Sequence, residues 1–255
     1  MISILIQTHN EEKNIKECIE SAKLLSNMIM VVDMKSTDNT QEIAKKSGAT
    51  VVTFPFSHYV EPGRAFGIKQ ITSEWVFILD ADERMTKELA EEIQKSIRDT
   101  IYTYFKVPRK NMFGGKKWLS HGGWWPDEQM RLMKTSAFEA WPSQIHSTPQ
   151  IKGEMGHLKN VFLHNFHGNV QSMVQKTLIF EEIESHLLFQ ADKPVSTVTF
   201  FRKFLGELFR RLIQKAGFLD GTIGIIESIY QAYSKTITYL LLYEKKNRRP
   251  VHPLP

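Results

Sequence analysis

The chain has 255 residues, of which 42% are hydrophobic and 24% are charged, as expected for a globular protein with one large domain, or one domain and an appendage. Its single cysteine, Cys18, excludes a disulfide framework and fits a reducing compartment. The net charge is +5, and the basic excess lies late in the chain, where it suits an anionic partner. No apolar run reaches the roughly 18 residues of a transmembrane helix, and residues 1–7 predict a strand and not a signal peptide.

The first third of the chain alternates between short apolar runs and segments with helical spacing of apolar residues. Strands are predicted at 2–8, 28–33, 49–54 and 75–80, and helices at 12–25, 40–47 and 63–72. Strand–helix units that repeat at this interval predict an α/β fold, with a mostly parallel sheet covered by helices on both faces.

The rest of the chain changes character twice. Residues 106–123 contain Pro108 and two glycine pairs and predict a long loop, and a β region is expected at 158–167. From about residue 170 the pattern is helical, with helices predicted at 171–190, 198–215 and 222–245. We therefore expect an α/β domain at 1–168 and a helical C-terminal region at 169–255.

The helix predicted at 198–215 carries a broad apolar stripe, and basic residues lie off it. The stripe consists of Phe201, Phe204, Leu205, Leu208 and Leu212, widened by Phe209 and Ile213. An aromatic stripe with a basic flank is typical of a helix that lies in the plane of an anionic membrane. Packing against the α/β domain, or against a second subunit in a homo-oligomer, explains the stripe equally well.

Polar side chains follow the apolar strands where each strand ends: Thr8 to Glu12 after the first, Asp33 after the second, and Asp80 and Asp82 after the fourth. The carboxyl ends of parallel strands meet at one edge of a sheet, where open α/β sheets bind ligands. Asp80 and Asp82 are two residues apart and point to the same side. Taken alone, they indicate either a divalent-cation site or a capped acidic turn.

Glycine-rich phosphate loops are missing from the strand–helix turns. Neither Gly-x-Gly-x-x-Gly nor a Walker sequence follows any predicted strand. A nucleotide bound at this sheet edge would therefore need a metal ion and basic side chains around its phosphates.

Four segments in the same order resemble the motifs of family 2 inverting glycosyltransferases with the GT-A fold. They are Ile-Gln-Thr-His-Asn-Glu-Glu at 6–12, Val-Val-Asp-Met-Lys-Ser-Thr-Asp-Asn-Thr at 31–40, the segment 64–83 ending in Ile-Leu-Asp-Ala-Asp-Glu, and Trp-Trp-Pro-Asp-Glu-Gln-Met-Arg-Leu-Met at 124–133. The last segment and Gly-Phe-Leu-Asp-Gly at 217–221 are similar to bacterial lipopolysaccharide-core β-glucosyltransferases. Two positions depart from the family pattern, Met34 and Ser147.

The resemblance implies transfer of a sugar, with inversion, from a nucleoside diphosphate sugar. We expect a UDP-sugar donor and a saccharide or lipid-linked glycan acceptor in cell-envelope synthesis. It implies Mg²⁺ or Mn²⁺ on Asp82, with Asp80 and His146 as further candidate ligands. Candidate nucleotide contacts are Thr8, Asn10, Glu12, Asp33, Arg64 near the base or phosphates, and Asp80 near the ribose.

On the acceptor side, the resemblance makes Asp127 the candidate base, since inversion needs a proton acceptor opposite the leaving group. Trp124 and Trp125 precede it, either as platforms for sugar rings or as core residues. Gln129 and Arg131 follow at strand-like alternation with Asp127, so all three side chains are expected on one face.

Two other functions stay open at this point. A nucleotidyltransferase also uses a sheet and metal-binding carboxylates, but usually has a glycine-rich basic loop near its N-terminus, which this chain lacks. A non-catalytic sugar-nucleotide or membrane-binding scaffold is disfavoured by the intact Asp80, Asp82 and Asp127. No nucleic-acid partner is expected, since only the basic tail favours one. The expected location is the cytoplasm, either free or peripheral on the inner face of the cytoplasmic membrane.

Overall fold

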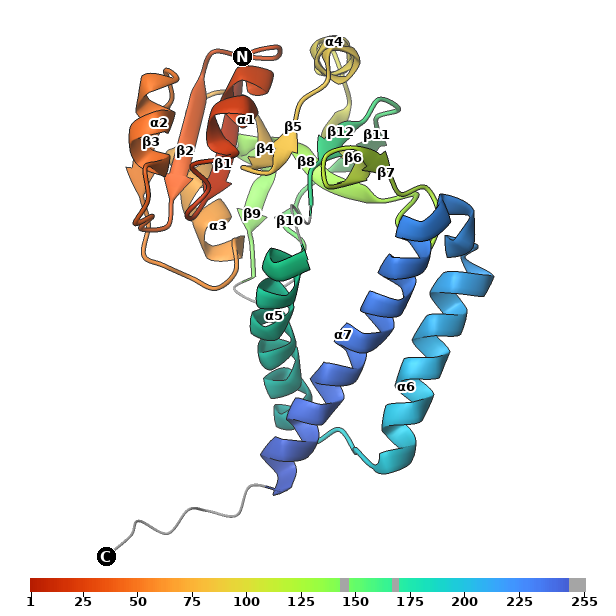
Figure 1. The fold of residues 1–255 in the computed structure, drawn as a ribbon. Helices are drawn as coiled ribbons and strands as arrows, with labels where there is room; N and C mark the ends of the chain where they lie inside the picture. Colours follow the sequence, from red (N-terminus) through yellow and green to blue (C-terminus); the bar gives the residue numbers. More distant parts are fainter. Residues whose placement is uncertain (143–146, 167–169, 248–255) are drawn as a thin grey trace, which may run out of the picture. The chain divides into compact units, whose positions relative to one another are not determined.

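The computed structural model describes residues 1–142, 147–166 and 170–247 of the chain (Figure 1). It divides into two compact units. The first comprises Met1–Asn111 and Pro126–Asn165, and the second comprises Met112–Trp125 and Phe166–Pro255. The segment 112–125 is thus grouped with the C-terminal helices. The assignment of catalysis to residues 1–168, and of a separate role to 169–255, stays a proposal.

The first unit is built on four parallel strands in the order β3-β2-β1-β4. These strands are β1 (Ile2–Thr8), β2 (Ile29–Asp33), β3 (Thr50–Thr53) and β4 (Trp75–Asp80). Ile4, Leu5 and Ile6 are fully buried, which means that both faces of β1 are covered. Helix α1 (Ile15–Ala22) packs with Ile4 and Ile6, and α3 (Glu61–Gln70) packs with Leu5. This architecture confirms the predicted α/β fold.

The remaining helices and strands of this unit extend and cover the sheet. Helix α2 (Thr40–Lys46) lies between β2 and β3 in the chain, and α4 (Lys87–Ser96) starts at Thr86, whose hydroxyl accepts a hydrogen bond from the Leu89 N–H. A short 3-10 helix (Thr135–Ala137) leads into the small pair β9 (Phe138–Ala140) and β10 (Gln150–Ile151).

Beyond β4 the sheet becomes mixed. Its order continues β4-β8-β6-β12-β5. Strand β8 (Glu128–Lys134) is antiparallel to β4 and to β6 (Tyr102–Phe113). Strand β12 (Phe162–His164) is parallel to β6 and antiparallel to β5 (Glu83–Arg84), and β11 (Glu154–His157) also pairs with β6. The chain thereby returns to the residues that directly follow β4.

The prediction of a long loop at 106–123 is wrong over its first half, because β6 extends to Phe113. Strand β6 runs through Pro108, which lies opposite Glu128, and the Arg109 N–H donates to the Asp127 carbonyl at 2.7 Å. Proline removes one ladder hydrogen bond, but pairing with β8 and β12 on both sides outweighs this weak local signal. Only Gly114 and Gly115, both with positive φ, turn the chain into the short β7 (Lys117–Trp118).

The second unit consists of helices and the segment 112–125. Its helices are α5 (Val170–Gln190), α6 (Thr197–Phe209), which continues as a π-helical turn (Arg210–Gln214), a 3-10 turn (Gly217–Asp220) and α7 (Gly221–Asn247). Helix α7 packs against both α5 and α6. The Asp220 carboxylate accepts hydrogen bonds from the Ser120 hydroxyl at 2.9 Å and the His121 N–H at 2.7 Å. A Cβ at Gly224 would lie 2.0 Å from the Gly217 carbonyl oxygen, so this close turn requires glycine.

The apolar stripe predicted on residues 198–215 is divided in the structure. Phe204, Leu208 and Leu212 are half-buried. A second line of apolar side chains is between 52% and 72% exposed, namely Val198, Phe201, Leu205, Phe209 and Ile213. None of the helices in the described parts of the chain is both long enough and apolar enough to cross a membrane.

Candidate active site

The polar residues predicted to converge do lie at one edge of the parallel sheet. Thr8 pairs in register with Asp33, and Gln7 pairs with Asp80, at the carboxyl ends of β1, β2 and β4. Asp82 follows β4 by two residues, and its carbonyl accepts the N–H of Asn165. The topology therefore collects these side chains where ligands bind in open α/β sheets.

The candidate nucleoside contacts at β1 and β2 organise two neighbouring loops. Asp33 is fully buried, and both of its carboxylate oxygens accept hydrogen bonds, from Ser36 and from the Gln41 amide at 2.7 Å. Asn10, which has a φ of 53°, accepts the Thr37 N–H at 2.7 Å. Glu12 accepts the Asn39 N–H and side-chain amide at 3.2 and 3.1 Å. These residues hold the loops after β1 and β2 together. Their contact with a nucleoside stays a prediction.

Asp80 is held by two arginines. Arg64 Nη2 lies 2.6 Å from both carboxylate oxygens, and Arg131 Nη2 lies 2.8 Å from Oδ2. Burial disfavours the charged form of Asp80, but Arg131 and Arg64 outweigh it and hold the pKa of Asp80 well below its usual range. Arg64 also stacks over Trp141, with its guanidinium carbon 5.1 Å from the ring centroid. The Asp80 carboxylate therefore orders two cationic side chains at this edge.

Glu83 continues this network into the core. It is fully buried, and its Oε1 accepts from Arg131 at 2.7 Å and from Arg109 at 3.3 Å, while Oε2 accepts the Asp80 N–H at 2.9 Å. Burial raises the pKa of Glu83, the nearby Asp80 raises it further, and Arg131 and Arg109 lower it in part. The result is an alternating chain of arginines and carboxylates from Arg64 to Asp127.

Asp127 lies just before β8 and receives three side-chain hydrogen bonds. Arg109 Nε and Asn111 Nδ2 each donate to Oδ2 at 2.8 Å, and Gln129 Nε2 donates to Oδ1 at 2.6 Å. Burial opposes ionisation, but Arg109 and the amides of Asn111 and Gln129 outweigh it, and the pKa of Asp127 is lowered. Asp127 is thus an ionised carboxylate at neutral pH, as a proton acceptor must be.

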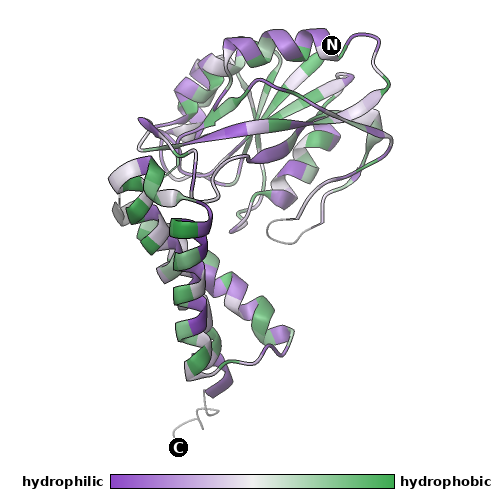
Figure 2. Cartoon of the chain, turned by 90° about the vertical axis from the view of Figure 1, so that its right-hand side faces the viewer, coloured by the Kyte–Doolittle hydropathy of each residue, from purple (hydrophilic) through white to green (hydrophobic). Residues whose placement is uncertain are grey.

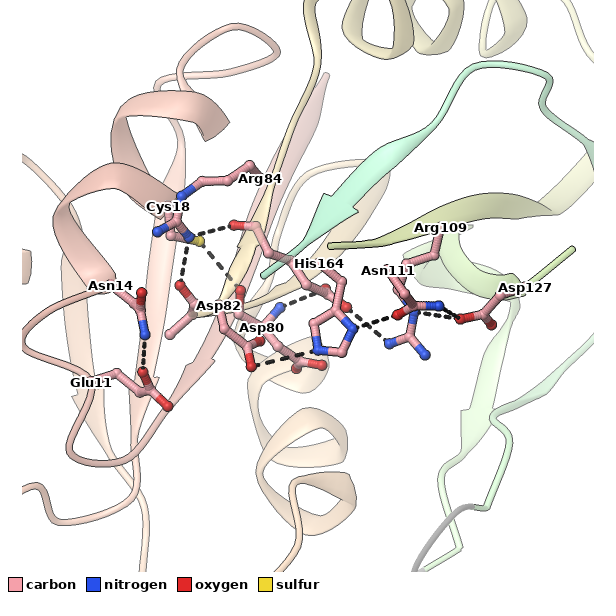
Figure 3. Close-up of polar contacts among 12 residues, drawn as sticks. Glu11, Asn14, Cys18, Asp80, Asp82, Arg84, Arg109, Asn111, Asp127 and His164 are labelled. Atoms are coloured by element: carbon pink, nitrogen blue, oxygen red, sulfur yellow. Dashed lines mark hydrogen bonds and ion pairs between the residues drawn. The ribbon is translucent and has the colours of Figure 1, made fainter. Parts of the chain in front are cut away.

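Asp82 faces a histidine of the neighbouring strand β12 (Figure 3). His164 Nε2 lies 3.6 Å from Asp82 Oδ2, and His164 Nδ1 lies 2.7 Å from Asn111 Oδ1. Because the Asn111 amide nitrogen donates to Asp127, its oxygen faces the histidine, so Nδ1 carries the proton. His164 Nε2 is then the ring nitrogen that faces the Asp82 carboxylate.

Asp82 and His164 are candidate ligands for a small divalent cation. Mg²⁺ and Mn²⁺ prefer oxygen ligands such as a carboxylate, and Mg²⁺ keeps several waters and also binds substrate phosphates. Among the residues that the structure describes, no third histidine, cysteine, aspartate or glutamate completes a cation-binding group. Asp80 is engaged by arginines, and His146, the other candidate ligand, lies outside the described residues.

Trp124 and Trp125 belong to the second unit and have aromatic partners there. Trp124 lies 4.7 Å from the Phe166 ring and 5.4 Å from the Arg211 guanidinium carbon, and Trp125 meets Trp118 edge-on at 5.6 Å. These contacts show how the segment 112–125 is packed. A role of either tryptophan as a sugar platform stays a prediction.

Four residues of this site have no role predicted from the sequence: Glu83, Arg109, Asn111 and His164. Arg109 and Asn111 fall within the segment predicted as a loop, although as strand residues they alternate onto one face. His164 stands at the end of a short strand, and no local spacing links it to Asp82. Gln129 and Arg131, by contrast, point to the same network as Asp127, as their alternation predicts.

Comparison with known proteins identifies relatives of this chain. The chain is 24% identical, over 95% of its length and 90% of the relative, to an uncharacterized glycosyltransferase of Rickettsia conorii. It is also 35% identical to the prophage-derived glycosyltransferase SunS of Bacillus subtilis over 40% of this chain and 24% of SunS. Residues 1–349 of TarS from S. aureus, solved with UDP-GlcNAc, share the fold, with a TM-score of 0.52, 14% identity, and coverage of 98% of this chain and 93% of that one. The profile of glycosyl transferase family 2 matches residues 3–149, more than half of the chain, which therefore belongs to that family of glycosyltransferases.

Proposed function

We propose that the protein is a metal-dependent inverting glycosyltransferase that uses a UDP-sugar as donor. One observation carries this proposal, the unbroken series of contacts from Asp82 through His164 and Asn111 to Asp127. It brings a candidate cation site and an ionised carboxylate to one edge of the sheet. Inverting transfer needs both, one for the leaving diphosphate and one for the acceptor proton.

In the proposed reaction the acceptor hydroxyl attacks the anomeric carbon of the sugar. The bond from that carbon to the diphosphate oxygen breaks, the electron pair stays on the diphosphate, and Asp127 takes the hydroxyl proton. A divalent cation held by Asp82 and His164 would neutralise charge on the diphosphate. We propose that Arg64, which Asp80 orients, lies near the diphosphate.

Support for a uridine donor comes from the fold and from the loops around β1 and β2. The similar TarS structure contains UDP-GlcNAc. In this chain Thr8, Asn10, Glu12 and Asp33 surround the equivalent strand ends, and the buried Thr8 hydroxyl has no hydrogen-bond partner among the described residues. We propose that these residues hold the nucleoside, with Asp80 near the ribose.

The donor and the metal are tested together by measuring nucleoside diphosphate release from a panel of nucleotide sugars with Mn²⁺ or Mg²⁺. We expect release of UDP from one UDP-sugar, its loss to background on chelation, and the same loss in Asp82→Ala. Mn²⁺ binding, measured by calorimetry in the presence of UDP, should weaken in Asp82→Ala and not in Glu42→Ala, whose carboxylate lies on the surface. Release of pyrophosphate would indicate a nucleotidyltransferase, and UDP binding without turnover would indicate a scaffold.

We further propose a lipid-linked envelope glycan as acceptor and a peripheral position on the inner face of the cytoplasmic membrane. The exposed line on α6 supports this, and Figure 2 shows hydrophobic turns along the helices of the second unit. The exposed charged residues beside that line, Arg202 and Lys215, are cationic. The one acidic residue of this helix, Glu207, is neutralised by Arg210 and Arg211.

The membrane proposal predicts binding to vesicles that contain phosphatidylglycerol, and weaker binding to neutral phosphatidylcholine vesicles. Phe201→Glu and Phe209→Glu should abolish flotation with vesicles without changing UDP release on a soluble acceptor. Ile101→Glu, at a site 75% exposed in the first unit, is the matched control and should float like the wild type. A wild type that does not float, and a dimer that Phe201→Glu dissociates, would instead assign this face to a second subunit.

A further inference from the structure

The two oxygens of the Asp127 carboxylate differ in how many hydrogen bonds they accept. Oδ2 accepts from both Arg109 Nε and Asn111 Nδ2 at 2.8 Å, whereas Oδ1 accepts only from Gln129 Nε2 at 2.6 Å among the described side chains. Each carboxylate oxygen offers about two lone-pair directions. Both directions on Oδ2 are thus used, and one direction on Oδ1 is left for a further donor.

Arg109 and Asn111 reach the same oxygen because they are two residues apart on β6, and side chains at this spacing share one face of a strand. The backbone contributes as well, because the Arg109 N–H donates to the Asp127 carbonyl at 2.7 Å. Strand β6 therefore fixes the main chain and the side chain of Asp127 together.

The two donor side chains, Arg109 and Asn111, form hydrogen bonds of their own with residues of β5 and β12. Arg109 Nη1 lies 3.3 Å from Glu83 Oε1, and the Asn111 carbonyl oxygen accepts from His164 at 2.7 Å. Asn111 is 1% exposed, so its amide has little room to rotate. A carboxylate supported in this way keeps one orientation before any substrate arrives, which lowers the reorganisation needed in the transition state.

We propose that Arg109 and Asn111 are the positioning residues of the base. They use both lone-pair directions of Asp127 Oδ2. Gln129 uses one direction of Oδ1, and the other direction of Oδ1 receives the acceptor proton. This inference rests on the proposed sugar transfer. It adds which oxygen of Asp127 takes the proton and which residues orient the carboxylate. The acceptor O–H bond breaks and its proton moves to Oδ1. At the same time the acceptor oxygen bonds to the anomeric carbon, and the diphosphate leaves with the electron pair of the bond that it loses.

The test compares Arg109→Gln and Arg109→Lys with Glu128→Gln, a neighbouring carboxylate that pairs with the exposed His157. Arg109→Gln should lower kcat about tenfold to a hundredfold, since a misplacement of about 1 Å in a reacting group can cost roughly a hundredfold. The acid limb of kcat/KM should also move to higher pH, because Arg109 is the cation that acts on Asp127. Arg109→Lys keeps the charge but not the fork of donors, so kcat should fall while the acid limb stays near that of the wild type.

Asn111→Ala provides a second variant should Arg109→Gln fail to fold, which circular dichroism and calorimetric UDP binding would reveal. It should lower kcat without weakening UDP binding. If a folded Arg109→Gln or Asn111→Ala enzyme keeps the kcat and pH profile of Glu128→Gln, the assignment is overturned. A wild type without transferase activity would contradict the proposed function instead, so the two failures are distinguishable.

Discussion

Asp127→Asn is expected to slow sugar transfer by roughly a hundredfold to ten-thousandfold, the usual contribution of a general base. The substitution keeps the size of the side chain but removes the charge that accepts the proton. It also replaces one acceptor oxygen by an amide, which must face either Gln129 or the pair Arg109 and Asn111, all of which donate to the carboxylate. UDP binding should be unchanged, because the proposed nucleoside contacts lie at the ends of β1, β2 and β4 and none of them is a hydrogen-bond partner of the Asp127 side chain.

The measurement is steady-state transfer from the donor identified by the nucleotide-sugar panel, with UDP affinity by calorimetry and Glu128→Gln as control. In the wild type, the lowered pKa of Asp127 predicts that the acid limb of kcat/KM lies below the ordinary range of an aspartate. Activity is then present at neutral pH and lost as pH falls through that limb, and Asp127→Asn should lack the limb. An asparagine variant with wild-type kcat would show that the base lies elsewhere.

The parallel half of the fold could be predicted because its signals are local. The apolar run that ends at Asp80 and the helical spacing of Ile15 and Ile19 each fit a strand or a buried helix face, and both are fully buried except for Asp80 itself. The order of polar strand ends then follows from right-handed parallel topology. This is why the sequence alone assigns Thr8, Asp33, Asp80 and Asp82 to one sheet edge.

The antiparallel half could not be predicted, because its pairings are long-range. Pro108 and the following glycines are weak strand formers, and only the register with β8 and β12 makes this segment a strand. The pairing of His164 opposite Glu83 brings the histidine to Asp82 across most of the domain sequence. The sequence also does not predict which apolar side chains of α6 are exposed. Apolar residues surround much of that helix, and only its packing decides which of them are buried.

The network around Asp80 gives the acidic motif a second role besides cation binding. Three arginines and three carboxylates alternate from Arg64 to Asp127, so each buried charge has an opposite neighbour. Glu83 is the member with no exposed surface, and it contacts two of the three arginines. Glu83 therefore connects Arg131, which contacts Asp80, to Arg109, which contacts Asp127.

Glu83→Ala is expected to destabilise the protein by about 3–5 kcal/mol, the usual loss when one partner of a buried ion pair is removed. The raised pKa of Glu83 shows that its own burial is only partly offset by Arg131 and Arg109. The loss therefore arises mainly from the arginines. The Arg131 side chain is 4% exposed, and among the described residues Asp80 would be its one remaining carboxylate partner. The Asp80 N–H would lose its acceptor as well.

Urea unfolding measures this effect as a lower midpoint with an unchanged slope. Glu83→Gln should lose less than Glu83→Ala, because its carbonyl oxygen still accepts from Arg131, and Glu42→Ala on the surface should not change the midpoint. An alanine variant with the wild-type midpoint would mean that Asp80 and Asp127 alone satisfy the arginines. Glu83 holds Arg109 in place, since its Oε1 accepts a hydrogen bond from Arg109 Nη1. A folded Glu83→Gln enzyme should therefore also show the kcat loss of Arg109→Gln in milder form. The same residue would then contribute both to stability and to the orientation of Asp127.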